Sequence, residues 1–388
     1  MARSRAPIHK SHRSCARPQF ERVALLLQGG GALGSYQAGV YQALAEADLH
    51  PNWVAGISIG AINSALIAGN PPERRVPRLR QFWESVSTPP FGLPDLFDLE
   101  GDLARTAINQ MRAWGILLGG APQFFAPRPV PPFLHPSGTM EALSFYDVEP
   151  LKASLERLVD FDLINEGPTR FSVGAVNVRT GNFVYFDSAT HQIGPDHIMA
   201  SGALPPGFPA IEIEGEFYWD GGLVSNTPLQ WVLDSHPRRD TLAFQVDLWS
   251  ARGDLPRDLM ESEVRQKEIR FSSRTRAATD SFRKGQQLRR AFARIYQDLP
   301  PELRQLPEAE LLAKEADDKV YNIIQLIYRS PKYEGAAKDY EFSRRTMEEH
   351  WRAGYHDAVR TLRHPEVLQR PDSLDGVFTF DLAVHSRE

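Results

Sequence analysis

Two glycine-rich turns, each following a short apolar run, constrain the fold of this 388-residue chain more than any other feature. The first turn, residues 28–34, reads QGGGALG and follows the apolar run 23–27. The second, residues 56–60, reads GISIG and also follows an apolar run. After the first turn, apolar residues recur at helical spacing over residues 35–47. After the second, residues 59–68 are mostly small, and a helix is expected there too. Two successive strand–turn–helix units predict an α/β domain with a mainly parallel sheet between two helical layers.

The first turn can present backbone N–H groups to an anion. Gly29, Gly31 and Gly34 satisfy the Gly-Xaa-Gly-Xaa-Xaa-Gly pattern of dinucleotide-binding folds. Those folds need an acidic residue at the end of the next strand to bind the ribose, whereas this strand ends at Gly56 and a serine. No phosphate-loop lysine follows either. The same N–H groups can stabilise the oxyanion of an acyl-transfer intermediate, and we favour that interpretation.

Ser58, at the centre of the second turn, is the predicted nucleophile. A serine hydroxyl reacts slowly at neutral pH unless a base is positioned beside it. Gly56 and Gly60 permit a tight strand-to-helix turn that exposes the side chain, and the following helix points its positive end at the site. The pentapeptide also occurs in structural turns. Its position between a strand and a helix is what favours a nucleophile.

Asp220 is the predicted base. An aspartate in a turn is most often solvated or capping, so its neighbours carry this assignment. The aromatic run 217–219 precedes it, and Gly221 and Gly222 let the backbone bend so that the carboxylate can face another loop. A carboxylate beside an apolar wall loses hydration and becomes a better proton acceptor than one in water.

The order of these three motifs resembles that of the patatin-like phospholipase family across residues 22–250. Residues 199–209, MASGALPPGFP, are also similar to the family's sequence ahead of its aspartate. The resemblance implies a three-layer α/β fold and a Ser–Asp dyad without a catalytic histidine, with Ser58 as nucleophile and Asp220 as base. It also implies oxyanion donors at Gly29, Gly30 and Gly31, supported by the turn glycines Gly34, Gly56, Gly60, Gly221 and Gly222.

By this resemblance, the chain hydrolyses lipid carboxylic esters through an acyl-Ser58 intermediate, as a phospholipase A or lysophospholipase does. The alternatives are an esterase on short-chain or storage-polyester substrates, and a non-catalytic lipid-binding regulatory protein. No metal or cofactor is implied, and no calcium-loop spacing occurs. The sequence departs from the family's usual pattern at Gln28, where aspartate is usual, and at Leu33, where arginine or lysine is frequent.

A rival enzyme class is the α/β-hydrolase with a Ser–Asp–His triad, which needs a histidine late in the chain. The candidates are His350, His356, His364 and His385. None follows a clear strand in a glycine-rich loop, so we interpret them as surface residues. His197 is closer to the motifs in sequence, and we predict a structural role for it.

Three regions are expected along the chain: a disordered basic tail at 1–20, the hydrolase domain at 21–250, and a mostly helical extension at 251–388. An insertion at about 89–138 interrupts the hydrolase domain. It is rich in proline and aromatic residues, so we expect no long regular element there.

Two segments are candidates for peripheral contact with a membrane. Residues 112–133 combine aromatic residues and prolines, as a lid or an acyl-chain contact does. Residues 264–294 are rich in lysine and arginine and could attract anionic lipid headgroups. A solvated helix face is the simpler interpretation of the second segment.

Bulk composition limits the classes of partner and the cellular compartment that are expected for this chain. A net charge of -5 argues against nucleic acid as a partner. The lipid or acyl ester expected as ligand is what the family resemblance implies. The single cysteine, Cys15, excludes an intrachain disulfide and fits a reducing compartment. No apolar run approaches the ~20 residues that span a bilayer. We therefore expect a cytoplasmic protein, with peripheral contact at a membrane, lipid or polyester surface. Self-association is compatible with this sequence.

Overall fold

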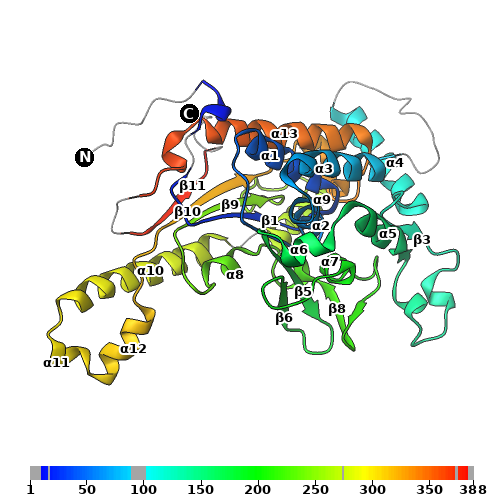
Figure 1. The fold of residues 1–388 in the computed structure, drawn as a ribbon. Coiled ribbons are helices and arrows are strands. Elements are labelled where there is room, and N and C mark those ends of the chain that lie inside the picture. Colours follow the sequence, from blue (N-terminus) through cyan, green and yellow to red (C-terminus); the bar gives the residue numbers. More distant parts are fainter. Residues whose placement is uncertain (1–9, 16–17, 89–101, 273–274, 372–374, 383–388) are drawn as a thin grey trace.

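The computed structural model describes residues 10–15, 18–88, 102–272, 275–371 and 375–382. Within them, one large sheet contains β1 (Arg22–Leu27), β2 (Trp53–Gly56), β5 (Arg170–Asn177), β6 (Phe183–Asp187), β7 (Ile211–Ile213), β8 (Glu216–Asp220), β9 (Thr241–Asp247), β10 (Tyr321–Ile327) and β11 (Val377–Phe380). The strand order is β11-β10-β9-β1-β2-β5-β8-β7, and β6 pairs with β5 (Figure 1). Pairing is parallel from β11 to β5 and antiparallel for β6, β7 and β8. The predicted mainly parallel sheet is confirmed.

Helices cover both faces of this sheet. One face carries α1 (Ser35–Glu46), α2 (Ile59–Ala68), α3 (Pro72–Val86) and α13 (Arg344–Leu362), and the other carries α8 (Leu229–Leu233) and α10 (Thr275–Asp298). In β1, Leu25 and Leu27 join the first core, whereas Ala24 and Leu26 join the second. Burial on both faces is the reason that this strand is continuously apolar.

The C-terminal region is mostly helical, as predicted, and it also adds two strands to the central sheet. β10 lies parallel to β9, with Ile324 opposite Phe244, and β11 lies beside β10. The apolar residues of β10 are buried, so a surface position would expose them to water. The helices of this region are α9 (Leu259–Phe271), α10, α11 (Pro301–Arg304), α12 (Pro307–Glu315) and α13. Helices α10 to α12 form an arm that extends from the body (Figure 1).

The insertion contains a long helix, so the expectation of no regular element there was wrong for its first half. Helix α4 spans Asp102–Gly119, a stretch without proline. The lobe that follows, residues 120–146, holds only short elements: β3 (Ala126–Pro127), η3 (Pro132–Leu134), η4 (Met140–Leu143) and the start of β4 (Tyr146–Asp147). Because prolines lack the backbone N–H that donates a hydrogen bond, this lobe forms only short helices and strands. Residues 89–101 lie outside the described ranges.

The helices between this lobe and β8 are α5 (Glu149–Leu158), α6 (Phe161–Glu166) and α7 (Pro195–Ser201). Across the described ranges, no helix combines the length and the apolar character needed to cross a bilayer.

Part of the predicted basic tail is ordered. Residues 12–14 form the short helix η1, in which His12 is buried. The side chains of His12 and Arg13 lie 3.2 Å and 2.8 Å from the carboxylate of Glu46 on α1. The prediction of disorder was therefore wrong for residues 10–15. Residues 1–9 and 16–17 lie outside the described ranges.

Helices α1 and α13 cross with their backbones in close contact, and this crossing yields a stability prediction. A Cβ atom at Gly39 would lie 1.9 Å from the carbonyl oxygen of Trp351. We expect Gly39→Ala to lower the free energy of unfolding by ~1–3 kcal/mol or more through overpacking. The control is Gly115→Ala in α4, where a Cβ atom meets nothing within 4 Å. It should raise stability by about 0.5–1 kcal/mol, since alanine favours helix. Urea unfolding measures both, and equal midpoints for Gly39→Ala and the unmodified protein would contradict the close crossing.

Candidate active site

Ser58 occupies a strained turn between β2 and α2. Its backbone angles are φ 55° and ψ -123°, a region that non-glycine residues enter at a cost of about 1–3 kcal/mol. The flanking glycines are required by close contacts. A Cβ atom at Gly56 would lie 2.2 Å from the carbonyl oxygen of Gly60, and one at Gly60 would lie 2.2 Å from that of Leu27. Such strain at a half-buried serine is typical of functional turns.

Asp220 reaches the neighbourhood of Ser58 through the sheet register. β5 extends beyond the carboxyl end of β2, because Val173 lies opposite Gly56, the last residue of β2. β8 pairs antiparallel with this projecting part and runs back to end at Asp220, opposite Ala175. The antiparallel strand therefore delivers a carboxylate to the same edge at which the turn after β2 presents Ser58.

The Asp220 carboxyl is buried and hydrogen-bonded. Its residue is 3% exposed, and the N–H of Gly222 donates to Oδ1 at 2.7 Å. Burial raises the pKa of Asp220 from 3.8 to about 6, although hydrogen bonds from the Ser58 side chain and the Gly222 N–H oppose this rise. The Ser58 side chain therefore lies close enough to the Asp220 carboxyl to affect its pKa. A Cβ atom at Gly221 would lie 2.6 Å from the carbonyl oxygen of Gly174, so this turn also needs glycine.

The glycine-rich loop between β1 and η2 (Gly31–Gly34) lies against Ser58. A Cβ atom at Gly29 would lie 3.1 Å from the Cβ atom of Ser58. The N–H of Gly29 points to the carbonyl oxygen of Asn226, 3.4 Å away. Within the described residues, no hydrogen-bond acceptor is recorded for the N–H groups of Gly30 and Gly31. Of the three predicted donors, these two are therefore the better candidates.

The two departures from the expected loop sequence have structural explanations. Gln28 is fully buried, and its Oε1 accepts the N–H groups of Leu248 at 2.6 Å and Trp249 at 3.0 Å. Its amide nitrogen also donates to Thr227 at 3.1 Å, which an aspartate could not do. Leu33 is fully buried as well, so no side chain at this position faces a substrate.

Gly34, the remaining loop glycine, gives close helix packing. A Cβ atom there would lie 2.5 Å from Cγ1 of Ile59 and 2.9 Å from the ring of Trp83. The side-chain amide of Asn63 donates to the Gly34 carbonyl oxygen at 2.9 Å. The loop and the first turn of α2 are therefore packed as one unit.

Two further residues support the site, and the sequence analysis did not assign them a role. The hydroxyl of Ser201 accepts the N–H of Ser58 at 3.0 Å and donates to the carbonyl oxygen of Gly174 at 2.7 Å. The amide of Asn226 donates to the carbonyl oxygen of Gly29 at 3.0 Å. Ser201 lies within residues 199–209, and the similarity of this stretch to the family's sequence was a signal that it could lie near the site. Asn226 offered none, because its role depends on a contact between distant segments.

No described histidine bonds to Ser58 or Asp220. His350, predicted to be a surface residue, is in fact fully buried, because its face of α13 packs inward. Burial disfavours its charge, but the Glu334 carboxylate at 3.0 Å outweighs this effect and raises the pKa of His350. The remaining candidates are His356, which is exposed, His364, which pairs with Glu366, and His385, which lies outside the described ranges.

His197 has the structural surroundings that we predicted for it. Its Nδ1 accepts the N–H of Gly194 at 3.0 Å, and its ring packs edge-on against Phe186. Burial lowers the pKa of His197, so the neutral imidazole is favoured. This histidine lies in the first turn of α7 and accepts the N–H of the residue that precedes the helix.

A small apolar cavity adjoins Ser58. A Cβ atom at Gly202, which lines the cavity, would lie 4.0 Å from the Cα atom of Ser58. Phe124 from the insertion and Phe208 face each other in this region, with ring centres 6.0 Å apart. The lining residues are Phe124, Val148, Leu151, Met199, Gly202, Ala203, Phe208 and Ile211.

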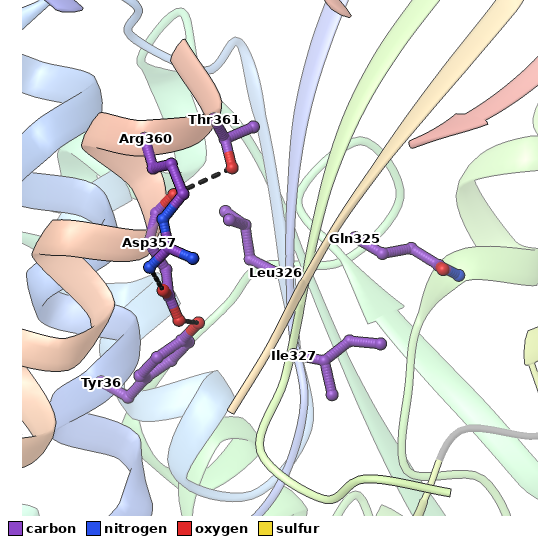
Figure 2. Close-up of a pocket in the computed structure, with 7 residues that line it drawn as sticks. All are labelled: Tyr36, Gln325, Leu326, Ile327, Asp357, Arg360 and Thr361. Carbon is purple, nitrogen blue, oxygen red and sulfur yellow. Dashed lines mark hydrogen bonds and ion pairs between the residues drawn. The ribbon is translucent and has the colours of Figure 1, made fainter. Parts of the chain in front are cut away.

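A second pocket lies between α1, β10 and α13 (Figure 2). Asp357 is its central polar group and accepts hydrogen bonds from Tyr36 and Arg360, each at 2.8 Å. No residue of the three motifs lines this pocket, so it is separate from the candidate active site. No cluster of three or more histidine, cysteine or acidic side chains suited to a metal occurs in the described part of the chain.

Three comparisons relate this chain to known proteins. The family model "Patatin-like phospholipase" matches residues 25–233, more than half of the chain, and the model DUF3734, "Patatin phospholipase", matches residues 269–374. A 68-residue stretch is 38% identical to the Arabidopsis thaliana protein "Triacylglycerol lipase SDP1L"; it covers 18% of this chain but 8% of that relative. Among solved structures, VipD from Legionella pneumophila aligns with a TM-score of 0.38 and 15% identity, over 99% of this chain and 77% of that one.

Burial of Asp220 predicts a pH-dependent stability. The folded protein holds this carboxyl neutral up to about pH 6, whereas the unfolded chain ionises it near 3.8. The stability that the neutral form confers is therefore present below the unfolded value and lost as pH rises through about 6. Asp220→Asn stays neutral throughout. It should gain up to about 3 kcal/mol over the unmodified protein at about pH 8, from roughly 1.4 kcal/mol per pKa unit, and only about 0.5 kcal/mol near pH 4.

Urea unfolding at the two pH values tests this. The control is Asp48→Asn, whose carboxylate is 92% exposed and whose positive φ asparagine tolerates, so its stability should stay unchanged. An equal gain for Asp220→Asn at both pH values would contradict a buried, titrating carboxyl.

Proposed function

Because this chain belongs to the patatin-like phospholipase family, we propose that it hydrolyses lipid carboxylic esters by acyl transfer to Ser58, with Asp220 as the base. One observation supports the proposal: the Ser58 side chain, on the strained turn, lies close enough to the buried Asp220 carboxyl to affect its pKa, which burial raises to about 6. A base with a pKa near the working pH accepts a proton efficiently and is still ionised at neutral pH.

The proposed reaction has two steps. Asp220 accepts the proton of the Ser58 hydroxyl while the oxygen attacks the ester carbonyl, and the N–H groups of Gly30 and Gly31 stabilise the resulting oxyanion. The alcohol leaves with the proton from Asp220, which gives the acyl-Ser58 intermediate. Asp220 then accepts a proton from water as that water attacks the acyl group. The carboxylic acid leaves, and the proton returns to the Ser58 oxygen.

The cavity beside Ser58 is the proposed start of the acyl-chain site. Its lining is apolar, with Phe124, Met199 and Phe208 among its side chains, so it suits a hydrocarbon chain rather than a charged group. We propose a phospholipid or lysophospholipid as the substrate. Short-chain esters and storage polyesters are the alternatives that the substrate panel below separates.

Lipid contact is proposed for α4 and the proline-rich lobe, residues 120–146. On α4, Met111, Trp114 and Leu118 recur at helical spacing and are 56–71% exposed. The lobe exposes Phe133 at 77% and Leu134 at 66%. The lobe is also joined to the site, because the N–H of its last residue, Tyr146, donates to the carbonyl oxygen of Gly207 at 3.0 Å, in the segment that lines the cavity. An apolar surface of this kind suits a lipid interface.

The alternative contact, the basic segment 264–294, is less favoured, because many of its cations have partners within the molecule. The ion pairs are Arg265–Glu268, Lys267–Asp339, Arg283–Asp280 and Arg289–Glu315. Paired charges contribute less to attraction of anionic lipid headgroups than free ones do.

Substitution of the two central side chains tests the proposed chemistry. We expect Ser58→Ala and Asp220→Asn each to lower turnover of a chromogenic acyl ester at least ~10³-fold, since both groups act in the same step. A fluorophosphonate should label the unmodified protein at Ser58 and fail to label Ser58→Ala. His350→Gln is the control and should retain activity if the protein stays folded. A panel of phospholipids, lysophospholipids, short-chain esters and polyesters then identifies the substrate.

A loss at His350 or His197 as large as that at Ser58 would contradict the dyad and favour a triad. Absence of labelling at Ser58 in every detergent and lipid condition would favour the non-catalytic lipid-binding alternative.

Polar substitutions in the lobe test the lipid contact. The double variant Phe133→Ser/Leu134→Ser should lower activity on phosphatidylcholine vesicles at least ~10-fold, because two exposed apolar side chains no longer insert. Activity on a soluble monomeric ester should stay within about twofold. The matched control is Leu311→Ser on α12, a residue that is 65% exposed and lies on the arm. Vesicle binding that weakens strongly with added salt would instead favour the basic segment.

A further inference from the structure

A segment of the C-terminal region lies directly on the glycine-rich loop. The N–H of Ala32 donates to the main-chain carbonyl oxygen of Asp339 at 2.8 Å. A Cβ atom at Gly31 would lie 2.0 Å from the same oxygen, and Gly31 has a positive φ of 55°. The two backbones are therefore in contact at the loop residue that precedes Ala32. This contact orients the peptide group next to the proposed oxyanion donors.

Asp339 is itself held in place by an ion pair with α9. Nζ of Lys267 lies 2.8 Å from Oδ1 and 3.0 Å from Oδ2 of Asp339. The same ammonium donates to the carbonyl oxygen of Ala336 at 3.1 Å, so it joins two points of the segment. The side chains of Lys267 and Asp339 are 27% and 22% exposed, which shields the pair from part of the solvent screening.

The other end of the loop is also held, through Trp249. The indole N–H of Trp249 donates to the carbonyl oxygen of Gly29 at 3.0 Å. The ammonium of Lys338 lies 5.1 Å from the centre of the Trp249 ring, within cation–π range. Lys338 in turn bonds to Glu268 of α9 at 2.8 Å, one residue along from Lys267. Lys267 and Glu268, which are adjacent on α9, thus bind Asp339 and Lys338 respectively.

Helix α9 contributes a third link at its C-terminal end. The carbonyl oxygen of Phe271 accepts the amide of Asn226 at 2.8 Å and that of Gln28 at 3.2 Å. Asn226 also donates to Gly29, and Gln28 is the first residue of the loop. The glycine-rich loop therefore has hydrogen-bonded or packed neighbours from the C-terminal region on both sides.

From these contacts we infer that Lys267 and Asp339 are positioning residues that set the geometry of the oxyanion loop. The inference rests on the proposed function and adds a role for the C-terminal region in it. Oxyanion donors act over a narrow range of about 2.7–3.1 Å, and loss of one typically lowers kcat by ~10²–10³-fold. A loop that shifts when its ion pair is removed should lose part of that effect while substrate binding stays intact.

The test uses the full chain with Lys267→Met, Asp339→Asn and the conservative Lys267→Arg. For a soluble acyl ester, the first two should lower kcat by ~10–100-fold with KM within about threefold of the unmodified value. Lys267→Arg keeps the charge and should restore most of the activity. The matched control is Glu348→Gln, which removes the Arg80–Glu348 ion pair between α3 and α13, with similar exposure of 34% and 36%. It should change neither constant.

An alkyl trifluoromethyl ketone provides a readout that general loss of structure would not move in the same way. It forms a tetrahedral adduct with a serine hydroxyl, whose oxyanion needs the same donors as the transition state. Its inhibition constant should rise in Lys267→Met by the same factor by which kcat/KM falls. Thermal unfolding checks that each variant is folded at the assay temperature. If Lys267→Met is unfolded at that temperature, the result for Asp339→Asn decides whether the positioning role holds, because asparagine keeps the shape of the side chain.

The outcomes separate the two proposals. If Ser58-dependent turnover is present but Lys267→Met and Asp339→Asn keep the unmodified kcat and inhibition constant, the positioning role is overturned and the proposed function stands. If the unmodified protein shows neither turnover nor labelling at Ser58, the proposed function fails first. A rise in KM with unchanged kcat would likewise overturn the positioning role, because it indicates substrate binding.

Discussion

Parallel pairing of β1 with β2 and β9 brings three strand ends to one edge of the sheet, and the candidate site depends on this arrangement. The glycine-rich loop leaves the end of β1, Ser58 follows β2, and Leu248 follows β9. Gln28 joins the first and third of these ends through its side-chain amide. Ligand sites in open α/β sheets occur at such edges, because the loops there converge while the strands stay fixed. The antiparallel β8 brings the Asp220 carboxyl to the same edge.

The site combines several features that are unfavourable for stability. Ser58 has a strained backbone, Asp220 is removed from water, and the turns around them allow no side chain at several positions. Each feature persists because the surrounding sheet and helices fix the backbone more strongly than the strain opposes it. The same features hold the Ser58 hydroxyl, the Asp220 carboxyl and the N–H groups of Gly30 and Gly31 in a fixed arrangement. Preorganisation of this kind is the usual reason that active sites are less stable than they could be.

Local sequence was sufficient for elements and motifs whose signal lies within a few residues. The strand near 23–27, the turn around Ser58 and the bend at Asp220 all follow from apolar runs and glycine positions. Long-range contacts could not be predicted in this way. No local pattern shows that β10 pairs with β9, that His350 faces inward, or that Asp339 reaches the loop. Helix α4 was missed because the prolines after it dominated the interpretation of the whole insertion.

The shared sheet has a consequence for how this protein can be divided. The two matched family segments read as separate modules along the chain, but β10 covers the side of β9 that β1 leaves open. Excision of everything after residue 250 would turn β9, whose residues are all buried, into an apolar edge strand with unpaired backbone groups. Such edges recruit strands from other chains and aggregate. A catalytic fragment designed for expression or for fusion should therefore retain β10 and β11, or replace them with another covering strand.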